Sequence, residues 1–234
     1  MLEQVKNLVF ELMENEDSGH GNDHLIRVYD LAMKFANAEG GNKDIVGIAA
    51  LLHDVDDYKL VGVENCKKLT NAKTIMSKAN VTKEIQEKVL EIIETMGYKK
   101  LLSGIRPNTI EGKIVSDADM CDVLGANGIL RVATYSNKHN KPFFDKNIWP
   151  IENMDSNKYN RECSDTAVCH FFEKVLRLRY LMLTEAGKKE AIIREKITID
   201  FLKNIFYEQD AIEWIEYLDN FLANLDSEER KANG

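Results

Sequence analysis

Two histidines and two aspartates have the residue types and the spacing of a metal-binding site. The pair His53-Asp54 directly follows the apolar run Ile45–Leu52. A carboxylate beside such a buried run is costly unless it is paired or binds a metal ion. His24 lies upstream of this pair, and Asp119 lies downstream. Imidazole and carboxylate ligands without a thiolate suit Mn²⁺, Fe²⁺, Ni²⁺ or Zn²⁺, and Mg²⁺ less well, so these four residues are the predicted ligands of a divalent ion, with Mn²⁺ favoured.

Four protein ligands leave positions for water on an octahedral ion. A bound divalent ion lowers the pKa of such a water toward neutrality. Hydrolysis is therefore the reaction class that this set of residues favours.

Asp119, the last of the four predicted ligands in the sequence, is expected to lie on a helix. On this helix the apolar arc contains Asp122, and Asp119 lies at the rim of the arc. A carboxylate that points toward a core is rarely accidental. Asp117 points away from Asp119 and is interpreted as part of an exposed acidic turn. Only Asp119 and Asp122 are therefore expected to face an inward site.

The predicted ligand His24 lies at the start of an expected helix. This helix begins near Asp23, whose side chain can cap the first turn. His24 and Arg27 would then share one face. His20 stands four residues before His24, and two histidines beside an acidic residue favour a ligand site. For either histidine alone, a surface or hydrogen-bonded role is the alternative.

Long helices are expected to position these residues. The chain has 234 residues with only three prolines, and apolar residues recur at helical spacing along most of it. The stretch Ser136–Arg161 is the exception and is predicted to be a loop that shapes a pocket through Phe143, Phe144 or Trp149; a disordered or dimer-forming loop is the alternative. The fold class is all-α, with helices expected at about residues 2–14, 23–38, 43–53, 62–78, 82–96, 110–134, 164–184, 187–206 and 208–223.

Composition excludes several classes of protein. The 31 Lys and Arg against 39 Asp and Glu give a net charge of −8, which disfavours a nucleic-acid partner. The four cysteines include no Cys-x-x-Cys pair and are interpreted as reduced thiols. No apolar stretch is long enough to span a bilayer, and the N-terminus lacks the pattern of an export signal. A cytoplasmic protein without a membrane partner is expected.

Several motifs together resemble one family. The order of His24, His53-Asp54 and Asp119 is similar to the metal-binding pattern of the HD-domain metal-dependent phosphohydrolases. The local sequences look like a bacterial branch of small, stand-alone HD proteins, and the resemblance covers roughly residues 15–215. The motifs that carry it are His-x-x-Arg-Val at 24–28, Ala-Leu-Leu-His-Asp-Val-Asp-Asp-Tyr-Lys at 50–59, Ser-Asp-Ala-Asp-Met-Cys-Asp-Val-Leu-Gly-Ala at 116–126, His-Phe-Phe-Glu-Lys-Val-Leu at 170–176 and Leu-Met-x-Thr-Glu-Ala-Gly-Lys-Lys at 181–189.

The resemblance implies a fold, a set of ligands and a reaction. It implies a single compact HD-type helical domain over residues 1–234, with a metal-binding core at about 15–135, a loop at 136–161 and a C-terminal helical extension at 162–225. It makes His24, His53, Asp54 and Asp119 the metal ligands and gives Asp57 an acid-base or water-orienting role. It also implies hydrolysis of a nucleoside triphosphate to a monophosphate and pyrophosphate.

A phosphorylated substrate needs cations even in an acidic protein. The substrate-binding candidates are Arg27, Lys59, Asp122, Arg131, His170 and Lys174, the last two on a basic stripe with Arg177. Two alternatives stay open: a phosphatase or phosphodiesterase acting on a nucleoside monophosphate or cyclic nucleotide, and a sensing or interaction module whose metal is structural. A homodimer is also left open.

Overall fold

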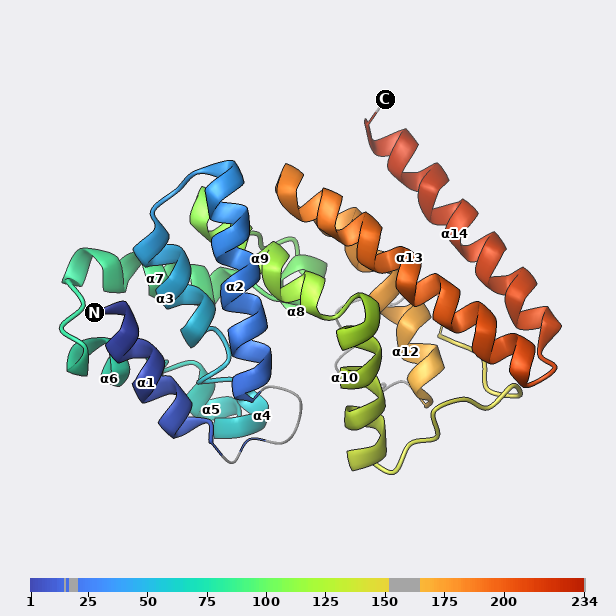
Figure 1. The fold of residues 1–234 in the computed structure, drawn as a ribbon, viewed down its shortest axis with the longest axis horizontal. Coiled ribbons are helices and arrows are strands. Elements are labelled where there is room, and N and C mark those ends of the chain that lie inside the picture. The colour runs from blue at the N-terminus through green and yellow to red at the C-terminus, as the bar shows by residue number, and fades with distance from the viewer. Residues whose placement is uncertain (15, 17–20, 152–164, 234) are drawn as a thin grey trace. The chain divides into compact units, whose positions relative to one another are not determined.

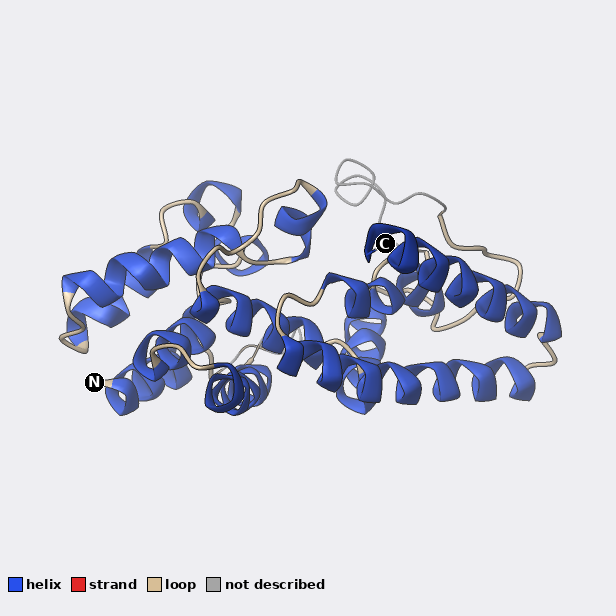
Figure 2. Cartoon of the chain, turned by 90° about the horizontal axis from the view of Figure 1, so that it is seen from above, coloured by secondary structure: helices blue, strands red, loops and turns tan. Residues whose placement is uncertain are grey.

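The described part of the chain is built from helices and loops without a strand (Figure 2). The computed structural model describes residues 1–14, 16, 21–151 and 165–233, without the side chains of Lys59, Ala232 and Asn233. The predicted all-α fold is confirmed. In chain order the elements are α1 (Leu2–Leu12), α2 (Asn22–Glu39), α3 (Lys43–Leu52), α4 (Tyr58–Val61), α5 (Val63–Cys66), α6 (Thr70–Lys78), α7 (Lys83–Thr95), α8 (Tyr98–Leu102), α9 (Ile110–Asp122), α10 (Gly125–Lys138), α12 (Ala167–Glu173), the 3₁₀ helix η1 (Val175–Leu181), α13 (Glu185–Glu208) and α14 (Ile212–Asn233) (Figure 1).

The chain forms two compact units. Unit 1 comprises Met1–Asp122 together with Leu183–Gly187, and unit 2 comprises Val123–Met182 and Lys188–Gly234. The predicted metal ligands all belong to unit 1. The single domain over residues 1–234, with its core extending to about residue 135, stays a prediction.

Helix α3 is the centre of unit 1. All of its residues from Ile45 to Leu52 are buried, as the apolar run predicts. It packs against α1, α2, α7 and α9, and α2 in turn packs against α9. Leu25, Phe35 and Ile114 are at most 1% exposed, and each such side chain contributes roughly 1.5–3 kcal/mol on burial. The three helices that carry the site therefore share one rigid core.

Local signals explain where these helices begin and end. The Asn42 side chain accepts hydrogen bonds from the backbone N–H groups of Asp44 and Ile45 and so caps α3. The Thr82 side chain accepts a hydrogen bond from the N–H of Ile85 and so caps α7. Gly40, at φ 87°, ends α2 in a conformation that favours glycine.

Three predicted helices are each interrupted. The helix expected at 62–78 breaks at Leu69, which is left-handed (φ 49°), and the helix expected at 110–134 stops at Asp122 and restarts at Gly125 (φ 74°). The helix expected at 164–184 ends before Lys174 (φ −134°, ψ −60°) and continues as η1. Each of these conformations interrupts the regular hydrogen-bond ladder of an α-helix. The predicted basic stripe is therefore wrong: His170 lies in α12, Lys174 follows its end and Arg177 lies in η1.

Aromatic side chains hold the segment before residue 152 in unit 2. The rings of Trp149 and Trp214 stack with their centroids 4.2 Å apart, and Phe144 packs against Trp214 and Phe206. Phe143 contacts Phe201. The start of the predicted loop is thus anchored to α13 and α14, while residues 152–161 lie outside the described residues.

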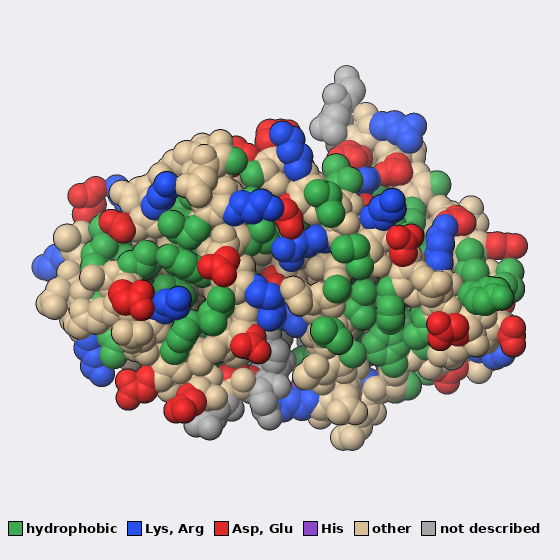
Figure 3. Space-filling model, in the orientation of Figure 1, with side chains coloured by type: hydrophobic (Ala, Val, Ile, Leu, Met, Phe, Trp, Pro, Cys, Tyr) green, Lys and Arg blue, Asp and Glu red, His purple; other side chains and the backbone are tan. Residues whose placement is uncertain are grey.

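The surface carries both signs of charge. Figure 3 shows acidic and basic side chains interspersed over the face in view. Among the described helices, none is both long and apolar enough to cross a membrane.

Candidate metal centre

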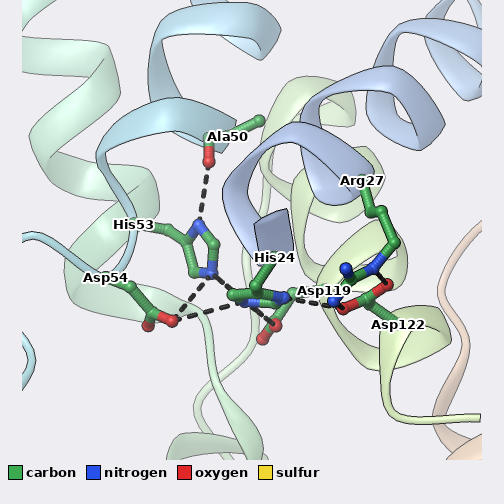
Figure 4. A network of polar contacts seen from close by, with 7 residues as sticks. All are labelled: His24, Arg27, Ala50, His53, Asp54, Asp119 and Asp122. Atoms are coloured by element: carbon green, nitrogen blue, oxygen red, sulfur yellow. Dashed lines mark hydrogen bonds and ion pairs between the residues drawn. The ribbon is translucent and has the colours of Figure 1, made fainter. Parts of the chain in front are cut away.

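The four predicted ligands come from the ends of three packed helices (Figure 4). His24 lies in the first turn of α2, and His53-Asp54 directly follow the C-terminal end of α3. Asp119 lies in the last turns of α9. Because α2, α3 and α9 share one core, residues 95 positions apart in the sequence meet at one point.

Ligand atoms of His24, His53 and Asp119 all lie within 4.8 Å of one another, and Asp54 lies beside the two imidazoles. The Nε2 atoms of His24 and His53 are 3.2 Å apart. Asp54 Oδ2 lies 3.3 Å from His24 Nε2 and 3.4 Å from His53 Nε2. Asp119 Oδ1 lies 3.5 Å and 3.6 Å from the same two nitrogen atoms. Atoms bound at roughly 2.0–2.3 Å to one ion have neighbour separations of this size.

The second nitrogen of each imidazole determines what the converging nitrogens can do. His53 Nδ1 lies 2.8 Å from the Ala50 carbonyl oxygen, and His24 Nδ1 lies 2.8 Å from Asp122 Oδ2. Both oxygens are acceptors, so both Nδ1 atoms must carry the proton. In the neutral rings both Nε2 lone pairs then face the two carboxylates. Two nitrogen lone pairs beside two carboxylates form a cluster of acceptors that favours a cation, and these residues fit a divalent metal ion.

The pKa values reflect the same demand for positive charge. Burial lowers the pKa of His53, but the Asp54 and Asp119 carboxylates outweigh it and hold the pKa well above its usual value. Burial raises the pKa of Asp119, but the hydrogen bond from His53 and the nearby imidazoles hold the pKa well below its usual range. Without a metal ion the cluster therefore attracts a proton, and a divalent cation meets the same demand.

The site is open on its acidic side. The side chains of His24 and His53 are 2% exposed, whereas those of Asp54 and Asp119 are 13% and 24% exposed. A ligand set buried on one side and accessible on the other leaves room for water or substrate. This openness is typical of a catalytic metal site rather than a closed structural one.

Asp122 lies behind His24. Its carboxylate is 1% exposed and accepts hydrogen bonds from His24 Nδ1 and from Nε and Nη2 of Arg27, at 2.8, 2.8 and 3.0 Å. The hydrogen bond to Asp122 raises the pKa of Arg27. This geometry supports an orienting role for Asp122, and direct substrate contacts by Arg27 and Asp122 stay predictions.

Of the acids that follow His53, Asp56 has a structural role that the sequence did not indicate. It is 5% exposed and accepts hydrogen bonds from the backbone N–H groups of Asn71 and Ala72 at 3.0 and 2.8 Å, which fastens the turn after Asp54 to α6. Asp57 is half-buried, and its N–H donates to the Asp54 carbonyl at 3.0 Å. Its acid-base role stays a prediction.

The four predicted ligands do not include the remaining predicted residues. Lys59 lies in α4, but its side chain is outside the described parts, as is His20. Arg131 in α10, His170 in α12 and Lys174 belong to unit 2. Their roles in substrate binding stay predictions.

The interpretation of Asp117 is wrong. Its side chain is fully buried, and burial raises its pKa to about 6 although Leu183 and Thr184 donate hydrogen bonds to it. The helical pattern correctly directs Asp117 away from Asp119 but does not reveal that a segment 66 residues downstream covers it. Only the Thr-Glu-Ala-Gly motif at 184–187 offered a signal.

The sequence did not connect Lys99 with the segment that follows the His-Asp pair. Its Nζ lies 4.4 Å from the centre of the Tyr58 ring, and Tyr58 stands four residues beyond Asp54. The contact places a cation on the segment that follows the His-Asp pair. Nothing in the spacing of the sequence linked α8 to α4.

Comparisons with known proteins identify the class of helical protein to which this fold and site belong, the HD domain proteins. The HD domain pattern matches residues 22–124. YpgQ of Bacillus subtilis, whose function is uncharacterized, is 30% identical over 206 residues, which are 87% of this chain and 91% of YpgQ. The chain therefore belongs to the HD domain family.

Solved structures resemble the whole fold. A protein from Lactobacillus plantarum has a TM-score of 0.79 at 33% identity over 90% of this chain and 97% of its own. An HD-superfamily hydrolase from Bacillus thuringiensis has a TM-score of 0.69 at 32% identity over the same shares. YpgQ in complex with ADP has a TM-score of 0.70 at 26% identity, covering 89% of this chain and 97% of its own.

Proposed function

We propose that this protein is a metal-dependent phosphohydrolase that converts a nucleoside triphosphate to a monophosphate and pyrophosphate. The observation that carries the proposal is the close grouping of two imidazole nitrogens with two carboxylates, which are the more exposed members of the group. A purely structural ion would need no such access.

A nucleotide is favoured as substrate by one relative. YpgQ, which is similar over nearly the whole length of this chain, has been crystallised with ADP. ADP carries an anhydride of the kind that the proposed reaction cleaves. Nucleotides are therefore the first substrates to test.

His24, His53, Asp54 and Asp119 would hold the ion, with Mn²⁺ favoured and Mg²⁺, Ni²⁺, Fe²⁺ and Zn²⁺ as alternatives. When bound, a divalent ion supplies Lewis-acid polarisation of a phosphoryl oxygen and lowers the pKa of a coordinated water.

The chain's own groups would do the rest. Asp122 keeps His24 in the tautomer whose Nε2 can bind metal, and the Ala50 carbonyl does the same for His53. Arg27 is 32% exposed, so its guanidinium can neutralise phosphate charge while it remains bound to Asp122. Asp57 would orient the attacking water or accept its proton.

Further cations would contact the phosphate chain. Lys59 follows the His-Asp pair, and Arg131, His170 and Lys174 are candidates from unit 2. Charge on the phosphoryl oxygens develops in the transition state, so positioned cations increase kcat as well as binding.

A nucleotide panel tests the proposal. Purified protein is incubated with Mn²⁺, Mg²⁺, Ni²⁺ or Zn²⁺, and phosphate and pyrophosphate are measured separately. We expect pyrophosphate from at least one nucleoside triphosphate and none from the Asp54→Ala variant. Release of phosphate alone would replace this reaction by that of a phosphatase, and a monophosphate formed from a cyclic nucleotide would indicate a phosphodiesterase. Metal uptake without any hydrolysis would favour a sensing module.

A further inference from the structure

The segment Leu183–Gly187 belongs to unit 1 although the chain on both sides of it belongs to unit 2. It contains the Thr-Glu-Ala-Gly motif, which the proposed reaction does not use. Its partners are on α9 and α2, the helices that carry Asp119 and His24.

Asp117 is the main partner of this segment. Its two carboxylate oxygens accept from the backbone N–H of Leu183 at 2.9 and 3.0 Å, and Oδ2 accepts from the N–H and the hydroxyl of Thr184, both at 2.7 Å. Hydrogen bonds to a carboxylate are stronger than those between neutral groups, and this one is fully buried. The segment is therefore firmly attached to α9.

Gly187 allows this close approach. A Cβ atom on Gly187 would lie 2.3 Å from Asp117 Oδ2 and 2.8 Å from Asp117 Cγ, which is too close for any side chain. The Gly187 N–H donates to Thr184 Oγ1 at 3.0 Å, so the threonine hydroxyl connects the start of α13 to Asp117. The Ala186 N–H donates to Glu39, the last residue of α2, at 2.5 Å.

The attachment lies on the far side of α9 from the metal centre. Asp117 precedes Asp119 by two residues and Asp122 by five, so a shift or rotation of this end of α9 moves all three together. Helix α2 packs against α9 as well. The segment Leu183–Gly187 and α2 therefore both pack against the end of α9. This end carries the predicted metal ligand Asp119 and also Asp122, which orients His24.

We propose that Asp117, Thr184 and Gly187 are positioning residues of the metal centre, which set its affinity by holding Asp119 and Asp122 in place. This inference rests on the proposed metal centre, but not on the identity of the substrate. The motif at 184–187 thereby has a role in the chemistry without contacting substrate.

Mn²⁺ binding to four variants of the full chain tests the proposal by calorimetry, under conditions where circular dichroism finds each variant folded. Thr184→Val removes the hydroxyl, and Thr184→Ser keeps it. Asp117→Asn removes an acceptor oxygen. Thr166→Val is the matched control, because Thr166 is also buried, and its hydroxyl accepts from the Cys169 N–H within unit 2.

We expect the Kd for Mn²⁺ to rise about 10-fold in Thr184→Val and at least as much in Asp117→Asn. Thr184→Ser should restore it to within about two-fold of the wild type, and Thr166→Val should lose stability without a change in Kd. If Thr184→Val loses stability but binds Mn²⁺ as the wild type does, the positioning role is overturned. If the wild type takes up no Mn²⁺, the metal centre itself is overturned and the positioning role with it. Should Asp117→Asn fail to fold, the two Thr184 variants decide the question.

Discussion

His24 and Asp122 are 98 residues apart in the sequence, yet the imidazole Nδ1 donates a 2.8 Å hydrogen bond to the buried carboxylate. Arg27 donates to both oxygens of that carboxylate from the next turn of α2. The three side chains form a chain of charge-assisted hydrogen bonds that ends at a metal-ligand position. The orientation of His24 is therefore a property of α2 and α9 together.

Replacing Asp122 by Asn should weaken metal binding by about 10- to 100-fold, because the neutral amide holds the His24 ring less strongly. Calorimetric titration with Mn²⁺ measures the change. Asp30→Asn, at an exposed position on α2, is the control and should bind as the wild type does. Equal affinities in both variants would contradict the orienting role.

Arg27→Met separates two functions in the same experiment. If Arg27 only supports Asp122, the variant should show weaker metal binding. If Arg27 also contacts substrate phosphate, its KM should rise by more than the change in metal affinity accounts for.

The metal ion should stabilise the folded protein through Asp54. At a Mn²⁺ concentration 100 times the Kd, binding adds about 2.7 kcal/mol to the free energy of unfolding. Asp54→Ala should remove this increment, because the loss of one of the four converging ligand atoms opens the coordination set. Thermal unfolding with and without Mn²⁺ provides the measurement, and a variant stabilised as much as the wild type would exclude Asp54 as a ligand.

Lys99 should contribute to substrate binding. Its ammonium group lies against Tyr58 on the segment after the His-Asp pair, where it can attract phosphate. Lys99→Met should raise KM for a nucleoside triphosphate by about 10-fold, the factor that corresponds to a charge-assisted contact of about 1.4 kcal/mol. Lys100→Met removes the neighbouring exposed charge and should have a smaller effect. If Lys99→Met and Lys100→Met have equal KM values, the rise in KM reflects the overall charge of the surface and not a contact made by Lys99.

Glu195 should make the stability of unit 2 depend on pH. Its side chain is 7% exposed, with Oε2 3.3 Å from Arg179 Nε. Burial raises its pKa to about 7; Arg179 opposes the rise, while Asp226 and Glu229 add to it.

The pKa of the Glu195 carboxyl is higher in the folded than in the unfolded protein. The contribution of this carboxyl to stability is therefore fully present below its unfolded pKa and is lost as pH rises through about 7. Glu195→Gln should therefore gain stability relative to the wild type between pH 5 and pH 8, by up to about 3 kcal/mol. Denaturant unfolding at the two pH values measures the difference. A difference that stays constant with pH would show that Glu195 does not titrate in this range.

The sequence predicts the bounds of two of the three helices that bear the site with good accuracy, but not the end of α9. Expected helices at 23–38, 43–53 and 82–96 agree with α2, α3 and α7 to within one residue at each end. Caps and glycines explain this success, because Asn42, Thr82 and Gly40 act through neighbouring backbone groups. Where a non-glycine residue such as Leu69 or Lys174 interrupts a helix, the sequence carries no comparable signal, and the predicted helices run through the breaks.

The sequence by itself determined the all-α class, the membership of His24, His53, Asp54 and Asp119 in one candidate site, and the inward direction of Asp122. These follow from residue chemistry and from helical periodicity, which are local properties. Only the tertiary structure decided which imidazole nitrogens face the Asp54 and Asp119 carboxylates, that Arg27 binds Asp122, and that Asp117 is buried beneath Leu183 and Thr184. These depend on contacts between segments 66 to 98 residues apart. Such contacts arise when α2, α3 and α9 pack around one core, and no local pattern encodes them.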